Sequence, residues 1–555
     1  MSELSLTGKR WSLPEHAEAL NASHVLLRLL KERGITEDTK LVPPSVYPDM
    51  EKAVDRIRSA IDHNELVGIF GDYDCDGVTA VAQLVRYFRR QNTEPFVRLP
   101  HRVRDGYGLK SATSKEIIEA GVKLLITCDT GIASVQEIAM LSEAGIDVII
   151  TDHHSVHEEL PKAFALIHPA LCAHPLPHPA GAGVVFALVS ALEDARPDAV
   201  GRGNWKGMKE DIALAMFGTV GDLVELRGHN RTLVQLGLKA LACIEGGPIG
   251  QLRERCKSTD APMTSVDIAF RVAPRINAAG RMTEADIALK ALLEGGDTLA
   301  QLDLLNEKRQ DITRSLLKEV VEECESDAVP PLLAKISGDY PHGIVGLIAG
   351  RLTEQFGRPS LVAHTDGRTC TASLRSPACY NIAEGLERVS NLLISYGGHA
   401  QAAGCTFALE NFDALRDRLT EDIRTHVDEK YLVPTLNIDA MLDAKDITTT
   451  FCEKLHLLEP YGQGNAEPLF LLRNVSLQDA RPCGKDQTHL QARICGIKSI
   501  GFGLAHLLES TDKFDVICRI GIDEWNGRKE AQIFICDLGV AIQAQKKAHS
   551  HAPNS

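Results

Sequence analysis

Between residues 65 and 169, short β-rich runs alternate with segments whose apolar residues recur at helical spacing, and this alternation constrains the fold more than any other feature. Strands that alternate with helices form right-handed βαβ units, so we expect a parallel sheet with helices on both faces. Ligands bind such sheets beyond the carboxyl ends of the strands. The strand candidates are residues 65–70, 95–99, 123–128, 147–151 and 164–169.

Acidic and imidazole side chains follow three of these strands. The sequence DYDCDG places Asp72, Asp74 and Asp76 behind the first strand, Asp129 follows the third, and Asp-His-His at 152–154 follows the fourth. Carboxylates this close together repel each other and raise one another's pKa unless water or a cation neutralises them. Carboxylates can bridge two hard divalent cations, and imidazole shifts the preference from Mg²⁺ toward Mn²⁺. The sheet edge is therefore predicted to hold a pair of divalent ions.

Each of these residues also has a non-functional interpretation when it is taken alone. The aspartate triplet suits a solvated acidic turn, Asp129 before Thr-Gly suits a helix cap, and Asp-His-His suits a surface loop. His154 and His157 form a His-x-x-His pattern, but no cysteine set or HExxH accompanies it, which disfavours a structural zinc site. Asp222, after the small-residue turn in MFGTVGDLVEL, adds a further carboxylate. Their common place at strand ends favours two ions about 3.5 to 4 Å apart that activate a water.

The rest of the chain contains a long helix and two further regions. Residues 298 to about 326 lack glycine and proline and predict one long helix that connects domains. A second α/β region follows and ends near residue 428. From about 430 to 541 short runs separated by turns, including Trp525-Asn526-Gly527-Arg528, fit a small barrel of about five strands such as an oligonucleotide-binding (OB) fold.

Composition narrows the class of protein. The formal net charge of −15 argues against a globally basic nucleic-acid binder but leaves room for a local basic groove. No apolar run reaches the roughly 18 residues of a membrane span, and the N-terminus lacks a signal-peptide pattern. The 14 cysteines contain no CxxC, so we expect reduced thiols in a soluble cytoplasmic protein. No GxxxxGK[ST] occurs, which disfavours a P-loop ATPase.

The motifs resemble a known family. DYDCDG, CDTG, TDHH and GTVGDLVEL, in this order, look like the four motifs of the DHH phosphoesterase superfamily, which includes nucleases, cyclic-dinucleotide phosphodiesterases and inorganic pyrophosphatases. HRVRDGYGL, PRINAAGRM, LNEKRQ, HGIVGLIAGRL, GGHAQAAG and LEPYGQGNAEPLF are similar to motifs of the RecJ family of single-stranded-DNA exonucleases. The resemblance covers the chain from about residue 45 to 540.

The resemblance implies an α/β fold in several domains. These are a parallel-sheet DHH phosphoesterase domain (45–285), connecting helices (286–330), a smaller α/β DHH-associated domain (331–428) and a C-terminal all-β OB-like domain (429–543). Outside the resemblance, we expect an N-terminal extension (1–44) and, from its polar composition, a disordered tail (544–555). The DHH-associated domain would face the metal site across a channel too narrow for a duplex, so that single-strand selectivity is steric.

The resemblance also implies the site and the reaction. The metal ligands would be Asp74, Asp76, Asp129, His153 and Asp222, with Asp129 bridging two Mn²⁺ or Mg²⁺ ions and Asp72 in an auxiliary place. Asp129, His153 and His154 would be the catalytic residues, His154 as a ligand or as an electrostatic aid to the scissile phosphate. A metal-activated water, without a covalent intermediate, would degrade single-stranded DNA from the 5′ end to mononucleotides in repair and recombination. We expect a monomer that acts with a helicase and a single-strand-binding protein and does not bind membranes.

Phosphate contacts need arginine together with small residues that let the backbone approach. Arg275, Asn277 and Arg281 in RVAPRINAAGR, Ser373, Arg375 and Ser376 in ASLRSP, and His399 in GGHAQAAG are the candidates. Arg102 is expected to bind a terminal 5′-phosphate together with Arg275 and Arg375, and Tyr107 to stack on a base. Solvated arginines and a core tyrosine are the alternatives.

Two departures from the family pattern and two rival functions remain. Cys405 stands where an aromatic residue usually follows AAG, and residues 168–186 are richer in histidine and proline than the expected asparagine-proline loop. A small-substrate DHH phosphodiesterase or oligoribonuclease is disfavoured by the C-terminal barrel and the long helix. A non-catalytic single-stranded-DNA-binding scaffold is disfavoured because every ligand position is filled.

Overall fold

The computed structural model describes residues 4–14, 21–36, 40–194, 207–325, 329–508, 513–525 and 528–541. The chain divides into two compact units. The parallel-sheet unit contains Gly34–Ile312 and Pro460–Ala466, and the second unit contains Met1–Arg33, Thr313–Glu459 and Glu467–Ser555. Within the described ranges, no helix has the length and apolar character needed to cross a membrane. The predicted turn at 525–528 and the predicted disordered tail at 544–555 fall wholly or partly outside the described residues.

The parallel-sheet unit is built on five strands, and the predicted parallel sheet is confirmed; the strand order is β3-β2-β4-β5-β6. The strands β2, β4 and β5 are buried almost throughout, which is why they are continuous apolar runs in the sequence. Gly71 pairs with Cys128 and Cys128 with Thr151, so the residues that follow these three strands meet at one edge. The bounds are β2 (Val67–Gly71), β3 (Phe96–Arg98), β4 (Leu124–Cys128), β5 (Asp147–Thr151) and β6 (Ala165–Ile167).

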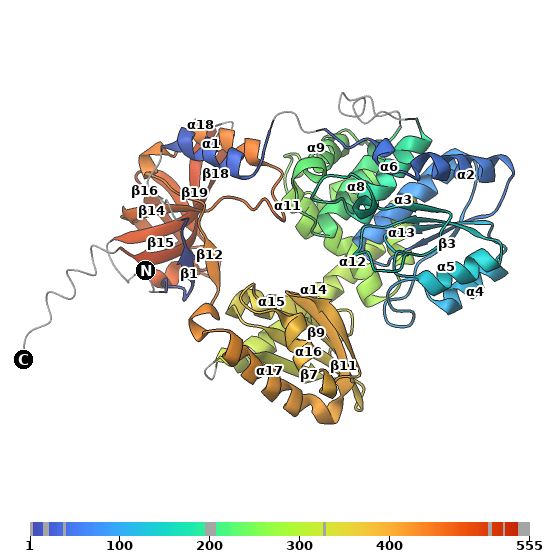
Figure 1. The fold of residues 1–555 in the computed structure, drawn as a ribbon. Helices are drawn as coiled ribbons and strands as arrows, with labels where there is room; N and C mark the ends of the chain where they lie inside the picture. The colour runs from blue at the N-terminus through green and yellow to red at the C-terminus, as the bar shows by residue number, and fades with distance from the viewer. Residues whose placement is uncertain are drawn as a thin grey trace, which may run out of the picture. The chain divides into compact units, whose positions relative to one another are not determined.

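Helices cover both faces of this sheet (Figure 1). Alternate strand residues, such as Ile69 and Ile126, pack against α2 (Met50–Asp62), α3 (Cys75–Arg90), α6 (Gly181–Leu192) and α8 (Lys209–Gly221). Their neighbours Phe70 and Leu125 pack on the opposite face against α4 (Ser111–Glu119) and α5 (Val135–Glu143). Because successive side chains of a strand point to opposite faces, the sheet has one hydrophobic core on each face.

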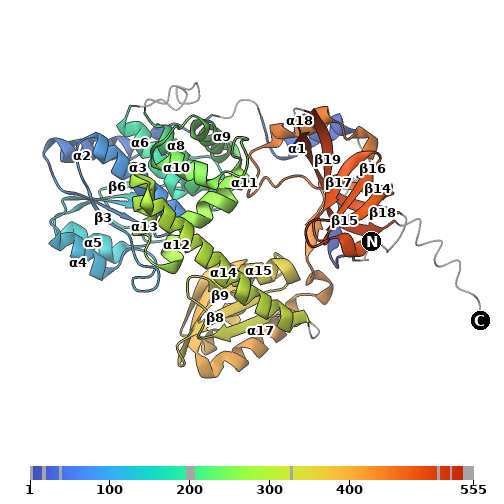
Figure 2. The same ribbon diagram turned by 180° about the vertical axis from the view of Figure 1, so that it is seen from behind.

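Further helices complete this unit and lead out of it. The bounds are α9 (Gly228–Ala242), α10 (Gly247–Cys256), α11 (Ser265–Asp267), the π-helical turn Ile268–Val272, α12 (Ala273–Met282) and α13 (Asp286–Glu294). The predicted long helix is α14 (Asp297–Glu325), which is visible along its length in Figure 2.

The second unit contains a mixed sheet in the order β10-β11-β9-β8-β7. Its strand–helix–strand start, β7 (Leu333–Ser337), α15 (Val345–Phe356) and β8 (Ser360–Thr365), was expected from the sequence. Leu361, Leu374 and Phe407 form its core together with Cys405, the departure from the family pattern. The remaining bounds are β9 (Thr369–Arg375), β10 (Ser395–His399), β11 (Ala402–Ala408), α16 (Ile382–Arg388) and α17 (Phe412–His426).

The C-terminal β region of the second unit has seven strands, in the order β13-β14-β18-β19-β17-β16-β15, rather than about five. The strand β15 was not predicted because its sequence, QDARPC, is polar and exposed. The strand β17 was not predicted either, and it is a short run between turns. The bounds are β13 (Ala440–Met441), β14 (Phe470–Val475), β15 (Gln478–Cys483), β16 (His489–Ile494), β17 (Ile497–Gly501), β18 (Phe514–Trp525) and β19 (Arg528–Val540), with helix α18 (Thr449–Leu455).

The N-terminal segment belongs to the second unit and contacts its C-terminal β region. Strand β1 (Arg10–Ser12) pairs in parallel with β12 (Thr435–Asn437), and helix α1 (Ala22–Glu32) follows. The Trp11 indole donates to the Asp537 carboxylate at 2.8 Å. The first and last parts of the chain therefore fold together.

Candidate metal centre

The aspartate triplet forms the turn between β2 and α3. Asp74 caps α3, and its Oδ1 accepts hydrogen bonds from the amides of Asp76 (2.9 Å) and Gly77 (3.1 Å). A Cβ on Gly77 would lie 2.5 Å from the Asp72 carbonyl oxygen, so only glycine fits there. The three acids alternate in the sequence because Asp72 follows the end of β2, Asp74 is the N-cap of α3 and Asp76 lies in the first turn of that helix.

Asp76 is buried against the N-terminus of α6. Its carboxylate accepts hydrogen bonds from the amides of Gly181 (2.6 Å) and Ala182 (2.8 Å). These are among the free amides that begin a helix, where the helix dipole favours negative charge. A Cβ on Gly218 of α8 would lie 2.5 Å from Asp76 Oδ1, so the small residues around this carboxylate make room for it.

Asp129 follows β4 directly and has a φ of 61°, in the left-handed region that non-glycine residues rarely adopt. Its amide donates to the Thr151 carbonyl at 2.9 Å, which ties this turn to the end of β5. Gly181 packs against the side chain, because a Cβ there would lie 2.6 Å from Asp129 Cβ. Backbone strain of this kind is characteristic of functional positions.

Asp152 holds the turn that carries the two histidines. Its Oδ1 accepts hydrogen bonds from the His153 amide (2.7 Å), the His154 amide (3.1 Å) and His154 Nδ1 (2.8 Å), while its Oδ2 accepts from the Ile132 amide (2.9 Å). These bonds lower the pKa of Asp152 although burial alone would raise it. Sequence reasoning did not assign this residue a separate role. The structure makes it a positioning residue with its oxygens already engaged.

Asp222 reaches the site from a helix rather than from a strand. It is the C-cap of α8, and the small residues Gly218–Gly221 are the last turn of that helix. The sequence predicted a turn at these small residues, and this was wrong because they are helical. The Asp222 carboxylate nevertheless reaches the sheet edge. Its Oδ2 lies 3.7 Å from His153 Nε2.

The predicted ligands converge into three overlapping groups. In each group, one ligand atom per residue lies within 4.8 Å of the others. His153 Nε2 is 3.0 Å from Asp129 Oδ1 and 3.7 Å from Asp76 Oδ2. Asp129 belongs to two groups, as a bridging carboxylate would. The groups are Asp72, Asp74 and Asp129; Asp76, His153 and Asp222; and Asp129, His153 and His154.

The electrostatics of this cluster favour a bound cation. Burial and the charge of Asp74 raise the pKa of Asp72 to about 8 and that of Asp76 to about 7. Burial and Asp76 raise the pKa of Asp222 to about 8 and that of Asp129 well above its usual range. Burial and His154 lower the pKa of His153 to about 4, which leaves its imidazole in the neutral, ligating form.

Unpartnered polar atoms point to the same conclusion. Asp72 Oδ1, Asp129 Oδ1 and His153 Nε2 are buried, and none of them makes a hydrogen bond among the residues that the structure describes, although the last two lie 3.0 Å apart. Buried polar atoms without partners are rare and need an explanation. Divalent cations that take oxygen and imidazole ligands fit this donor set.

His154 differs from His153. Burial would lower its pKa, but the hydrogen bond and charge of Asp152 prevail and raise it to about 9. Its ring centroid lies 5.4 Å from that of Tyr107, so Tyr107, which is 42% exposed, stands beside the cluster.

Arg102 also lies beside the aspartate turn. Its guanidinium stands over the Tyr73 ring, 4.0 Å from the centroid. Its Nε is buried and, within the described ranges, has no hydrogen-bond partner.

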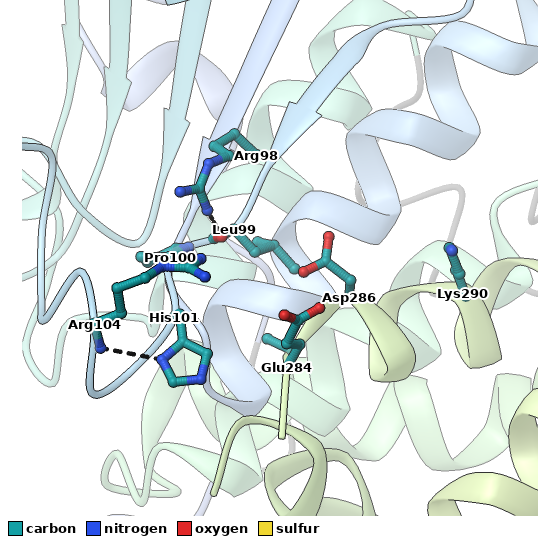
Figure 3. A pocket seen from close by; sticks show the side chains of 9 residues that line it. Arg98, Leu99, Pro100, His101, Arg104, Glu284, Asp286 and Lys290 are labelled. Carbon is teal, nitrogen blue, oxygen red and sulfur yellow. Dashed lines mark hydrogen bonds between the residues drawn. The ribbon is translucent and has the colours of Figure 1, made fainter. Parts of the chain in front are cut away.

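A pocket lies next to the loop that carries Arg102, between the end of β3 and the start of α13 (Figure 3). His101 and Arg104 line one side, and Glu284 and Asp286 line the other. Arg104 forms an ion pair with Asp105 at 3.0 Å. None of the predicted site residues lines this pocket.

The predicted phosphate contacts on α12 are engaged within the protein. Asn277 Oδ1 accepts a hydrogen bond from the Cys75 amide at 2.9 Å and so supports the aspartate turn. Arg275 donates to Asp303 at 2.8 Å and to the Arg271 carbonyl at 2.7 Å. Arg281 lies near the end of the same helix.

The remaining predicted contacts lie in the second unit. Arg375 donates to Ser373 Oγ at 2.9 Å, and both residues belong to β9. Ser376 is buried, and its hydroxyl donates to the Tyr380 carbonyl at 2.8 Å, which is a structural contact. His399 ends β10, a strand whose five residues are all exposed.

Three family models match the chain. They are described as the DHH family N-terminal domain (residues 66–218), the DHHA1 domain (330–425) and the RecJ OB domain (438–537). A single-stranded-DNA-specific exonuclease RecJ of Bacillus subtilis is 32% identical, over 94% of this chain and 69% of that protein. The protein of the same description from Dickeya dadantii is 30% identical, over 94% of this chain and 96% of its own length.

Solved structures are similar as well. RecJ of Thermus thermophilus in complex with Mn²⁺ has a TM-score of 0.81 and 27% identity, over 98% of this chain and 80% of that one. Its complex with Mg²⁺ has a TM-score of 0.75 and 26% identity, over 96% and 78%.

Proposed function

The chain belongs to the RecJ family of single-stranded-DNA-specific exonucleases, and from this premise we propose what its individual residues do. The protein is a metal-dependent exonuclease that acts on single-stranded DNA, with Mn²⁺ or Mg²⁺ as cofactor. The observation that carries the assignment of the site is the convergence of five aspartates and two histidines at one sheet edge with unpartnered, buried ligand atoms.

We propose that Asp76, His153 and Asp222 hold one divalent ion and that Asp72 and Asp74 hold a second, with Asp129 shared between the two. The grouping of the ligand atoms supports this division. Bound ions of this kind activate a water and stabilise the attacking and leaving oxygens of a phosphodiester. The protein holds the carboxylates together through the amides that begin α3 and α6, so the ligand geometry is preorganised.

His154 is the proposed electrostatic partner of the scissile phosphate. Its Nδ1 is held by Asp152, which orients the ring and favours the charged imidazolium. Tyr107 is proposed to stack on the base next to that phosphate, because its ring adjoins His154 and is partly exposed.

Arg102, Arg281, Ser373, Arg375 and His399 are proposed to contact phosphate groups. Arg275 would do so only after releasing Asp303, and the internal bonds of Asn277 and Ser376 favour positioning roles. The finer features of the reaction are also proposals: 5′ to 3′ polarity, release of mononucleotides, and work in repair and recombination beside a helicase and a single-strand-binding protein. We also propose a monomeric state, a cytoplasmic location and the domain boundaries given above.

A time course with single-stranded DNA labelled at the 5′ end or at the 3′ end tests the function, with Mn²⁺, Mg²⁺ or EDTA. The proposed polarity predicts immediate release of a 5′-labelled mononucleotide while the 3′-labelled strand shortens progressively, and no reaction in EDTA. Rapid hydrolysis of dinucleotides without DNA cleavage would overturn the assignment in favour of a small-substrate phosphodiesterase.

The Asp129→Asn variant tests the shared ligand. Asparagine tolerates the left-handed backbone at this position, so the fold should remain intact. We expect cleavage to fall by more than the roughly 100-fold that loss of a positioning partner typically causes. Asp147→Asn, at a partly buried ion pair with Arg56 outside the metal centre, is the matched control and should cleave like the wild type. Near-normal cleavage by Asp129→Asn with Mn²⁺ would refute the shared role.

A further inference from the structure

We infer that His168 is a positioning residue for the metal centre: its imidazole Nε2 donates a hydrogen bond to the His154 carbonyl and fixes the turn that carries His153 and His154. This inference rests on the proposed function of that turn. His168 lies directly after β6, it is 1% exposed, and its Nε2 is 2.9 Å from the His154 carbonyl oxygen.

The direction of this hydrogen bond follows from the second ring nitrogen. The Ala170 amide lies 3.2 Å from His168 Nδ1 and caps the short turn Pro169–Leu171. A backbone N–H can only donate, so Nδ1 carries no proton and the ring proton is on Nε2. The Nε2–H group therefore donates to His154. Since backbone groups occupy both nitrogens, His168 is not itself a metal ligand.

The turn needs such a tether because the chain leaves the sheet there. Residues 152–164 contain no helix or strand in this described part of the chain, and Ser155 and His157 are exposed. Asp152 fixes the amide side of the turn through its carboxylate. His168 fixes the carbonyl side, so that the two histidines are held from both ends.

Partners that orient a ligand-bearing segment typically contribute 10- to 100-fold to metal affinity or activity. The sequence signal lies in the histidine-rich loop at 168–186, which departs from the family pattern and whose first residue, His168, contacts the His154 carbonyl.

Three variants separate the two hydrogen bonds of His168. His168→Ala removes both. In His168→Gln the side-chain amide N–H reaches the place of Nε2, and in His168→Asn the side-chain oxygen occupies the place of Nδ1. We expect the alanine and asparagine variants to bind Mn²⁺ about 10- to 100-fold more weakly, and the glutamine variant to bind nearly as the wild type does.

The readout is Mn²⁺ binding to the full chain without DNA, followed by electron paramagnetic resonance of the free ion, together with kcat and KM for single-stranded DNA. KM should change less than kcat, because the strand contacts are unaltered. Unaltered Mn²⁺ affinity in His168→Ala would overturn the inference, and so would rescue by asparagine but not by glutamine, since the cap of the short turn would then be the relevant contact.

Two controls keep the outcomes distinct. Thermal unfolding shows whether His168→Ala folds, and if it does not, the comparison of glutamine with asparagine decides the matter. If the wild type fails to cleave DNA, the proposed function fails, while the Mn²⁺ titrations still decide whether His168 positions the site.

Discussion

Asp76 and Asp152 are both buried acids at the same sheet edge, but their surroundings prepare them for different tasks. Four donors surround the carboxylate of Asp152, and its pKa is lowered. Asp76 accepts hydrogen bonds from two amides, but burial and the charge of Asp74 outweigh them and raise its pKa to about 7. Asp152 is satisfied by the protein, whereas Asp76 needs a cation. The sequence contains both residues in equally acidic motifs, and only the three-dimensional contacts separate them.

His229 lies outside the metal centre and makes the fold sensitive to acid. Its Nδ1 accepts a hydrogen bond from the Val42 amide at 3.0 Å. Burial and the neighbouring His174, whose ring is 5.1 Å away, lower the pKa of His229 to about 3. An unfolded histidine titrates near pH 6.5, so the unfolded state binds more protons below that pH. Stability is therefore lost as the pH falls from about 6.5 toward 3.

We predict that His229→Asn removes this dependence, because asparagine keeps an acceptor for Val42 and cannot be protonated. Between about pH 7.5 and pH 5 the wild type should lose about 2 kcal/mol more of its free energy of unfolding than the variant. Urea denaturation at the two pH values measures the difference. Substitution of the exposed His63 by asparagine is the control, and equal losses in the wild type and His229→Asn would contradict the prediction.

At the scale of elements, the site depends on the starts of two helices. The beginning of α3 carries two of the acids, and the first amides of α6 hold Asp76. Gly181, the first residue of α6, touches both Asp76 and Asp129. Helix α6 therefore contacts the acids that follow two different strands, β2 and β4.

Gly181→Ala should disturb these contacts. The added methyl group would lie 2.6 Å from Asp129 Cβ and 2.7 Å from its Oδ1, so the carboxylate must move. Overpacking of this kind destabilises by about 1 to 3 kcal/mol, and we expect weaker Mn²⁺ binding as well. Isothermal titration with Mn²⁺ and thermal unfolding measure the two effects. Gly350→Ala on α15, where a Cβ meets nothing within 4 Å, is the matched control, and equal behaviour of both variants would refute the prediction.

The elements that were predictable are those with a local signal. The strands β2, β4 and β5 are apolar runs, and the rule for parallel sheets is enough to predict that Asp72, Asp129 and His153 lie at one edge. The strands β10 and β15 were missed because they are exposed and contain glycine or proline, so no apolar alternation marks them. No local signal in the sequence reveals the hydrogen bond that Asn277 accepts from the Cys75 amide, because these residues are 202 positions apart.

At the scale of the whole molecule, the N-terminal segment completes the C-terminal β region. The Asp537 carboxylate is fully buried and accepts hydrogen bonds from Thr7 Oγ1 at 2.7 Å and from Trp11 Nε1 at 2.8 Å. The Trp11 ring also packs on Gly539, where a Cβ would lie 2.7 Å from it. More than 500 residues separate these partners in the chain, so no sequence window reveals their pairing.

Trp11→Phe tests this pairing because it keeps an aromatic ring and removes the indole donor. Asp537 Oδ2 then loses a partner while it stays buried, which costs about 1 to 3 kcal/mol. The urea midpoint of the second unit, followed by circular dichroism, should fall accordingly, and trypsin should cleave the C-terminal β region faster. Tyr431→Phe, a change at a half-exposed ring, should stay within about 0.5 kcal/mol of the wild type.

Mn²⁺ binding should not change in Trp11→Phe, since the Mn²⁺ ligands belong to the parallel-sheet unit. An unchanged midpoint would show that the C-terminal β region is stable without this contact, and weakened Mn²⁺ binding would show that the two units do not fold independently.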